Sequence, residues 1–180
     1  MTDWTFRNLQ DEQAPWVLHN FGKRPSWQPL LGIAEELGEL LDAISLERVS
    51  NSTEEIKDSI ADAIIFMADF CTSQSFELAT IYRNALKQHH ALPSSFLSGR
   101  LMLTCYGRLA HSFLKKTQGI RGTAVEHDRD AAKHLTDLLV CLRQIGIVYK
   151  LAPLPVITRE VWERVRQRDW KKNATTGESP

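Results

Sequence analysis

The chain has 180 residues, of which 43% are hydrophobic and 24% are charged, a composition typical of a globular protein with its own core. Its 22 basic and 22 acidic residues cancel to a formal net charge of zero, which disfavours nucleic-acid binding because that function usually requires a basic excess. No apolar run reaches the length of a membrane span, and the polar N-terminal residues lack the apolar core of a signal peptide. We therefore expect a cytoplasmic protein with neither a nucleic-acid nor a membrane partner.

Apolar residues recur at helical spacing along most of the chain, and no segment alternates at period two for long enough to predict a strand. The sequence therefore predicts an all-α helical bundle. The predicted helices cover residues 3–21, 27–48, 52–72, 77–89, 94–116, 125–150 and 158–170. Pro15 should kink the first of them or start a new one, and Thr158 should cap the last. Cys71, Cys105 and Cys141 lie inside apolar helical patterns and should be small buried side chains.

The chain also resembles itself. Residues 31–46 align with a later segment shifted by 69, and residues 56–70 align with 131–145, shifted by 75. On this register Glu36 falls on Cys105, Glu39 on Arg108, Asp58 on Lys133 and Asp62 on Asp137. We expect a single all-α domain over 1–170, with an acidic half at about 1–90 and a degenerate second half with a closing helix at about 94–170. A flexible tail should follow at 171–180.

A cluster of glutamates lies in the segment GIAEELGELL, residues 32–41. In a helix, Glu35 and Glu39 are four residues apart and Glu36 and Glu39 are three apart, so all three carboxylates project from one side. Each like-charge pair at this spacing costs a helix roughly 0.2–0.5 kcal/mol. No lysine stands four residues later to offset the repulsion, whereas a bound divalent cation would.

Glu55, Asp58 and Asp62 form a second acidic cluster on the next predicted helix. Two helices with their acidic faces turned together would make an oxygen-lined metal site. A capping box between Ser52 and Glu55 explains Glu55 without a metal. Oxygen ligands without nearby histidine or cysteine favour Mg²⁺, with Mn²⁺ possible. Because Mg²⁺ commonly completes its shell with substrate phosphates, hydrolysis of a phosphate ester or phosphoanhydride is the natural chemistry.

The pair Glu36-x-x-Glu39, followed by an acidic helix ending in Asp62, resembles the signature ExxE, spacer, ExxD of the all-α nucleotide pyrophosphohydrolase superfamily. That group includes the MazG proteins, the dimeric dUTPase-like enzymes and the dCTP pyrophosphatases. The segments WVLHNF and EVWERVRQRDWKKN also look MazG-like, so the resemblance extends over most of the chain. It implies a MazG-like bundle that binds Mg²⁺ and cleaves a (d)NTP to the (d)NMP and pyrophosphate. The family's habit of dimerising implies a homodimer.

One position departs from the family pattern. Ser59 stands three residues before Asp62, where the family has glutamate. Asp58 is the preferred replacement, because residues four apart still share a helix face; the alternative is that Glu55-x-x-Asp58 is itself the ExxD. On the preferred interpretation the metal ligands are Glu36, Glu39, Asp58 and Asp62. The expected catalytic residues are Glu35, Glu36 and Glu39, with Glu35 as a ligand or as the base for the attacking water.

Other residues could contact the nucleotide. They are Trp16, Asn20, Phe21, Lys57, Arg83, Arg168, Trp170 and Lys171. The first three could form a base pocket, the basic helix residues could reach phosphates, and the C-terminal ones could fold over the nucleotide. Each group has a structural alternative, namely core packing, a solvated helix face or a helix end.

The sequence thus predicts a Mg²⁺-dependent nucleoside triphosphate pyrophosphohydrolase. The alternative is a MazG-like scaffold that has lost catalysis and acts as an interaction or nucleotide-sensing module, which Ser59 would explain.

Overall fold

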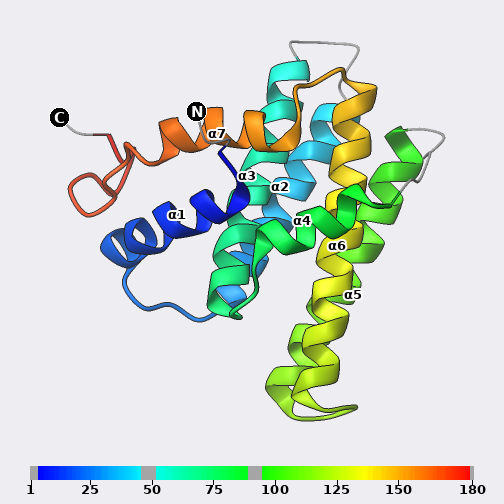
Figure 1. The fold of residues 1–180 in the computed structure, drawn as a ribbon. Coiled ribbons are helices and arrows are strands. Elements are labelled where there is room, and N and C mark those ends of the chain that lie inside the picture. Colours follow the sequence, from blue (N-terminus) through cyan, green and yellow to red (C-terminus); the bar gives the residue numbers. More distant parts are fainter. Residues whose placement is uncertain (1–3, 46–51, 89–94, 179–180) are drawn as a thin grey trace. The chain divides into compact units, whose positions relative to one another are not determined.

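The computed structural model describes residues 4–45, 52–88 and 95–178. Within these ranges the chain is all-helical, as predicted (Figure 1). The helices are α1 (Phe6–Phe21), α2 (Trp27–Ser45), α3 (Ser52–Ser73), α4 (Leu78–Leu86), α5 (Ser95–Gln118), α6 (Ala124–Val148) and α7 (Leu154–Val165). Among the described residues, no helix combines the length and the apolar character that crossing a membrane requires. Ser52, the predicted N-cap, is instead the first residue of α3, and the residues before it lie outside the described ranges.

The structure contradicts one of the two alternatives for Pro15 and the predicted N-cap of the last helix. Pro15 does not start a new helix, because α1 continues through it to Phe21. The last helix begins at Leu154, not after Thr158, and Pro155 lies in its first turn. Proline is tolerated there because the first N–H groups of a helix have no intrahelical acceptor. Thr158 is instead completely buried inside α7.

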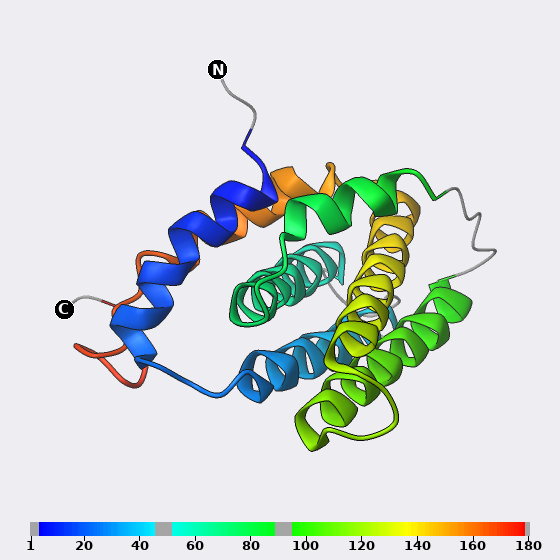
Figure 2. The same ribbon diagram turned by 60° about the horizontal axis from the view of Figure 1, so that its bottom comes forward.

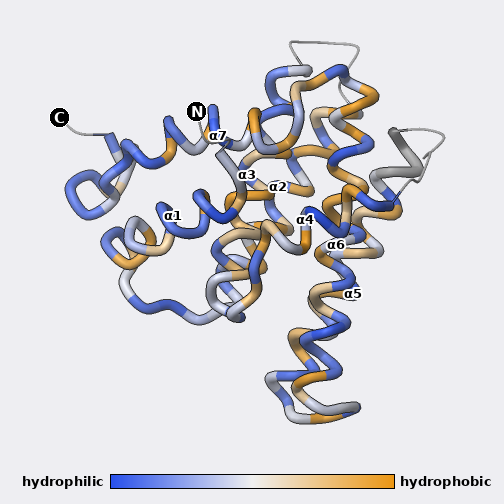
Figure 3. The backbone as a smooth tube through the Cα atoms, viewed as in Figure 1, coloured by the Kyte–Doolittle hydropathy of each residue, from blue (hydrophilic) through white to orange (hydrophobic). Residues whose placement is uncertain are grey.

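The chain divides into two compact units, Met1–Leu78 with Ala152–Pro180, and Ala79–Leu151. The first unit contains α1, α2, α3 and α7. In it α3 packs along α2 and also contacts α1 and α7, so α3 is the central helix. The α3 residues that the sequence predicted to face inward are all buried, namely Ile56, Ile60, Ile64, Met67 and Phe70. In the hydropathy colouring, apolar positions alternate with polar ones along the helices (Figure 3).

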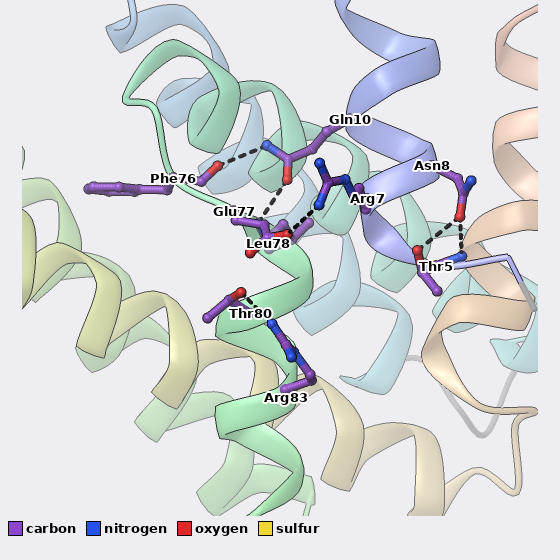
Figure 4. A network of polar contacts seen from close by, with 9 residues as sticks. All are labelled: Thr5, Arg7, Asn8, Gln10, Phe76, Glu77, Leu78, Thr80 and Arg83. Atoms are coloured by element: carbon purple, nitrogen blue, oxygen red, sulfur yellow. Dashed lines mark hydrogen bonds and ion pairs between the residues drawn. The ribbon is translucent and has the colours of Figure 1, made fainter.

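Polar contacts join the outer helices of the first unit. Glu12 of α1 accepts hydrogen bonds from Trp162 Nε1 at 2.8 Å and from Arg166 at 2.7 Å, which ties α7 to α1. Gln10, also on α1, donates to the Phe76 carbonyl at 3.0 Å and accepts from the Leu78 N–H at 2.8 Å (Figure 4). Gln10 therefore holds α1 against the turn that follows α3.

The second unit is built on the hairpin of α5 and α6, which pack along each other as α2 and α3 do (Figure 2). Several aligned positions of the two hairpins are buried in both. Leu30, Ile33, Leu40 and Ala43 of α2 correspond to Gly99, Met102, Leu109 and Ser112 of α5, and all are buried. Ile56, Ile60, Ile64, Met67 and Phe70 of α3 correspond to Ala131, Leu135, Leu139, Leu142 and Ile145 of α6, and these are buried too. Other aligned positions differ, since Leu37 is buried whereas Tyr106 is only half-buried, so the duplication stays a prediction. The three cysteines are free thiols and buried, as expected.

Candidate functional site

The two predicted acidic clusters meet across the α2–α3 pair. Glu36 on α2 is half-buried, and its pKa is raised to about 8. Burial is the largest cause, and the charge of Asp62 on α3 is the next, ahead of Glu39 and Glu35. The pKa of Asp62 is raised to about 6 by burial and by Asp58, against the opposing effect of two arginines. Carboxylates that perturb each other in this way lie within electrostatic range.

A groove of about 340 Å³ runs between α2 and α3, and we call it the carboxylate groove. It is lined by Glu39, Asp42, Ala43, Glu55, Asp58, Ser59 and Asp62. Asp42 is a member that the sequence analysis did not single out, although it stands one turn beyond Glu39. Glu35 is exposed and does not line the groove, so its influence in this structure is on the pKa of Glu36.

A second cavity of about 380 Å³ adjoins the groove, and we call it the aromatic pocket. Its lining is Gln13, Trp16, Phe21, Arg24, Glu36, Asp62, Ile65, Phe66, Val165, Arg168 and Trp170. Asp62 lines both the pocket and the groove. Trp16 packs edge-on against Phe21, with ring centroids 5.7 Å apart. The pocket thus joins aromatic walls to two arginines and to two carboxyls with raised pKa values.

The C-terminal segment 166–178 supplies one wall of the aromatic pocket. The Trp16 indole donates to the Arg168 carbonyl at 3.0 Å, and the Trp170 N–H donates to Asn20 Oδ1 at 2.7 Å. The segment then turns back on itself, since the Asp169 N–H donates to the Gly177 carbonyl. Residues 171–178, expected to be a flexible tail, therefore include hydrogen-bonded turns.

Asn20 was expected to contact substrate, but its side chain is engaged within the protein. It is buried, its Oδ1 accepts from Trp170 and its Nδ2 donates to the Trp16 carbonyl at 3.0 Å. It is not among the residues lining the aromatic pocket. In this structure Asn20 fixes the wall that carries Arg168 and Trp170.

The remaining basic candidates are not among the residues that line the groove or the pocket. Lys57 forms ion pairs with Glu54 and, at 3.6 Å, with Glu160 of α7, so it joins α3 to α7. Arg83 belongs to the second unit and donates to Thr80 at 2.7 Å. Lys171 is exposed in the C-terminal segment.

Sequence reasoning missed three residues that shape the pocket or its support: Gln13, Arg24 and Asp69. Arg24 pairs with Asp69 of α3, and its guanidinium lies 4.9 Å from the Phe21 ring centroid. Gln13 and Asp69 are both buried. Gln13 and Asp69 are polar residues inside apolar helical patterns. This could have marked them in the sequence, because a buried polar side chain requires a partner.

The structure also describes the surroundings of Ser59, the position that departs from the ExxD motif, and of Asp58 beside it. Ser59 is buried, at 6% exposure, and it lines the carboxylate groove. Asp58, the expected replacement ligand, accepts a hydrogen bond from Arg164 of α7 at 2.7 Å. A cation at this carboxylate would therefore compete with an arginine.

The donor chemistry of the groove fits Mg²⁺, since every acidic side chain offers hard oxygen atoms and mutual repulsion favours a cation. The side chains do not already converge: within the described ranges, no three His, Cys, Asp or Glu residues form a group arranged to hold a metal. Glu39 is exposed and Asp58 is only half-buried, so both have room to change rotamer.

Comparisons with models of protein families, with curated proteins and with solved structures find no match to this chain. The MazG-like resemblance therefore stays a prediction from the sequence motif. The function proposed below rests on the carboxylate groove and the aromatic pocket.

Proposed function

We propose that the protein is a Mg²⁺-dependent nucleoside triphosphate pyrophosphohydrolase, which converts a (d)NTP to the (d)NMP and pyrophosphate. The observation that carries the proposal is the sharing of Asp62 between the carboxylate groove and the aromatic pocket. A nucleotide has the same two parts, a planar aromatic base and a polyphosphate that travels with Mg²⁺. The aromatic pocket, at about 380 Å³, falls in the range of small-molecule sites.

The aromatic pocket suits the nucleoside end of such a substrate. Trp16, Phe21 and Trp170 offer ring faces and edges for a base, which makes stacking the main source of affinity there. Arg168 lines the same pocket, lies near Asp62 and lowers its pKa, so it is positioned to neutralise phosphate charge. The carboxylate groove then takes the metal-bound phosphates, with Glu39 and Asp62 as the expected ligands.

When bound, the metal would neutralise phosphate charge and lower the pKa of a water molecule. The chain's own contribution is the set of carboxyls with raised pKa values. Glu36, with a pKa of about 8, holds a proton at neutral pH in the absence of metal and is able to give it up. Glu35 stays our expected base or additional ligand.

A second candidate has specific support. Buried Ser59 replaces the motif glutamate, and Asp58 is occupied by Arg164. Both features weaken the acidic set while leaving the aromatic pocket intact. The alternative is therefore a nucleotide-sensing or interaction module that binds without turnover.

Calorimetric titration with Mg²⁺ and an α,β-imido nucleoside triphosphate, which resists cleavage, tests the site. We expect the nucleotide to bind, and Mg²⁺ to tighten its binding. Glu39→Gln should remove the Mg²⁺ effect, whereas Glu54→Gln, an exposed α3 residue outside the groove, should keep it. Binding of neither ligand would refute the proposal, and binding with no turnover of a natural (d)NTP would favour the sensing module.

A further inference from the structure

Gln13 of α1 is 3% exposed, yet half of its amide has no partner. Its Nε2 donates to the Ile65 carbonyl of α3 at 2.9 Å. Because a carbonyl can only accept, this bond fixes which end of the amide is nitrogen. The other end, Oε1, is buried without a hydrogen bond within the described structure. Gln13 lines the aromatic pocket.

Arg24, which lines the same pocket, has an unpaired donor where Gln13 has an unpaired acceptor. Its guanidinium is held by Asp69 and stacks over Phe21, but its Nε is buried without a hydrogen-bond partner in the described structure. Arginine donates and never accepts, so this atom requires an acceptor. An unpaired buried polar group is costly, and because Gln13 and Arg24 line the same pocket, one ligand there can satisfy both.

We propose that Gln13 and Arg24 determine the specificity of the aromatic pocket, by reading the polar edge of the planar ring bound there. Gln13 Oε1 accepts from an N–H of the ring system, and Arg24 donates to an adjacent ring nitrogen or carbonyl oxygen. Asp69 is the positioning residue, because it fixes Arg24 without lining the pocket. This inference rests on the proposed function, and it names the edge of the nucleobase as the recognised group.

The order of their partners along α3 places Gln13 and Arg24 at the base end of the proposed nucleotide, away from its phosphates. Asp62 borders the carboxylate groove, Ile65 holds Gln13 and Asp69 holds Arg24. At 1.5 Å rise per residue, Asp69 lies roughly 10 Å along the helix from Asp62. A nucleotide with its phosphates at the groove would therefore present its base edge toward Gln13 and Arg24.

The ligand itself can be varied to test this without metal or turnover. Tryptophan fluorescence would follow the titration of each nucleoside monophosphate and of an analogue that lacks the donor at the base edge, such as 3-methyluridine monophosphate against UMP. For the base that binds, we expect the intact base to bind at least about tenfold more tightly. Equal binding of base and analogue would overturn the inference while leaving the proposed function standing.

Two variants test whether Gln13 and Arg24 cause the preference for the intact base. Gln13→Leu should reduce the preference for the intact base to less than about threefold, and Arg24→Lys, which can still pair with Asp69, should weaken binding about tenfold. Gln167→Leu and Arg159→Lys are exposed controls outside the pocket, and both should leave the preference unchanged. An unaltered preference in Gln13→Leu would contradict the assignment. Failure of every nucleotide to bind the wild type would refute the proposed function and this inference together.

Discussion

Glu36 is the residue at which burial and charge repulsion act together. Its carboxyl is half-buried, and three other carboxylates raise its pKa in addition to the effect of burial. The ionised form is therefore costly in the folded protein without a cation. An active site commonly carries such a cost, because the same field that disfavours the bare carboxylate favours a bound metal.

This cost makes the stability of the metal-free protein depend on pH. Between pH 4.5, the ordinary pKa, and about 8, the folded state holds the Glu36 proton more tightly than the unfolded state does. The contribution of Glu36 to stability is therefore fully present below this window and is lost as pH rises through it. In EDTA, Glu36→Gln should raise the free energy of unfolding by roughly 1–2 kcal/mol at pH 8, and by much less at pH 5, after allowance for solvent screening.

Urea unfolding at both pH values measures this difference. Glu163→Gln, on the exposed face of α7, is the control and should change stability by less than about 0.5 kcal/mol at either pH. A Glu36→Gln variant less stable than wild type at pH 8 would contradict the account.

At this scale, spacing was enough to find Glu39, Asp58 and Asp62 of the groove, but not Asp42. It could not find Gln13, Arg24 or Asp69, because a single polar residue in an apolar pattern does not reveal its partner. Arg24 and Asp69 are 45 residues apart in sequence and meet only through the packing of the loop before α2 against α3. Asn20 was singled out as a substrate contact, but its hydrogen bonds to Trp16 and Trp170 could not be foreseen.

At the scale of the helices, the close approach of α2 and α3 depends on Gly32. A Cβ added there would overlap the Phe66 ring, whereas one added at Gly38 would meet open space. Phe66 also lines the aromatic pocket, so this contact fixes part of the pocket wall.

The two glycines should respond in opposite directions to the same substitution. Gly32→Ala should destabilise the protein by about 1–3 kcal/mol through overpacking, although alanine is the better helix former. Gly38→Ala should stabilise it by roughly 0.5–1 kcal/mol, because only helix propensity changes. Thermal unfolding of both variants provides the measurement, and stabilisation by Gly32→Ala would show that α2 and α3 are not packed this closely.

The buried amide of Asn20 is one of the groups that hold the C-terminal segment on α1. Asn20→Ala would leave the Trp170 N–H without its acceptor, so it should cost about 1–2 kcal/mol and speed hydrogen exchange at the Trp170 amide. Asn84→Ala, exposed on α4, is the control and should leave that exchange unchanged. Unaltered exchange in Asn20→Ala would mean that the pocket wall is held by other contacts.

Helix periodicity predicted every helix seen in the described residues, because each apolar face is long and regular. It failed where proline decides the boundary. Pro15 was given too much weight inside α1, and Pro155 was assigned to the end of one helix when it lies in the first turn of the next. A proline is compatible with both positions, and tertiary contacts decide between them.

For the whole molecule, the central comparison is between two helical hairpins that differ in their charged side chains. The position of Asp62 on α3 corresponds to Asp137 on α6. Asp137 is paired with Lys133 at 2.7 Å, so its charge is already compensated. The two aligned aspartates therefore differ in their charge environment.

Matched substitutions in the two hairpins test this asymmetry. Asp62→Asn should lower Mg²⁺-dependent nucleotide turnover by about a hundredfold or more, since it removes a group shared by groove and pocket. Asp137→Asn should change turnover by less than about threefold, because it breaks only a solvent-screened ion pair. Comparable losses in both variants, measured by pyrophosphate release, would show that the second hairpin also contributes to the reaction. The expected homodimer stays a prediction.

Product identification tests the proposed function most directly. The protein would be incubated with each (d)NTP and Mg²⁺, with and without EDTA, and the nucleotides separated by anion exchange. We predict a nucleoside monophosphate and pyrophosphate in equal amounts from at least one substrate, abolished by EDTA and by Glu39→Ala. No turnover of any (d)NTP, or release of a nucleoside diphosphate with orthophosphate, would contradict the account.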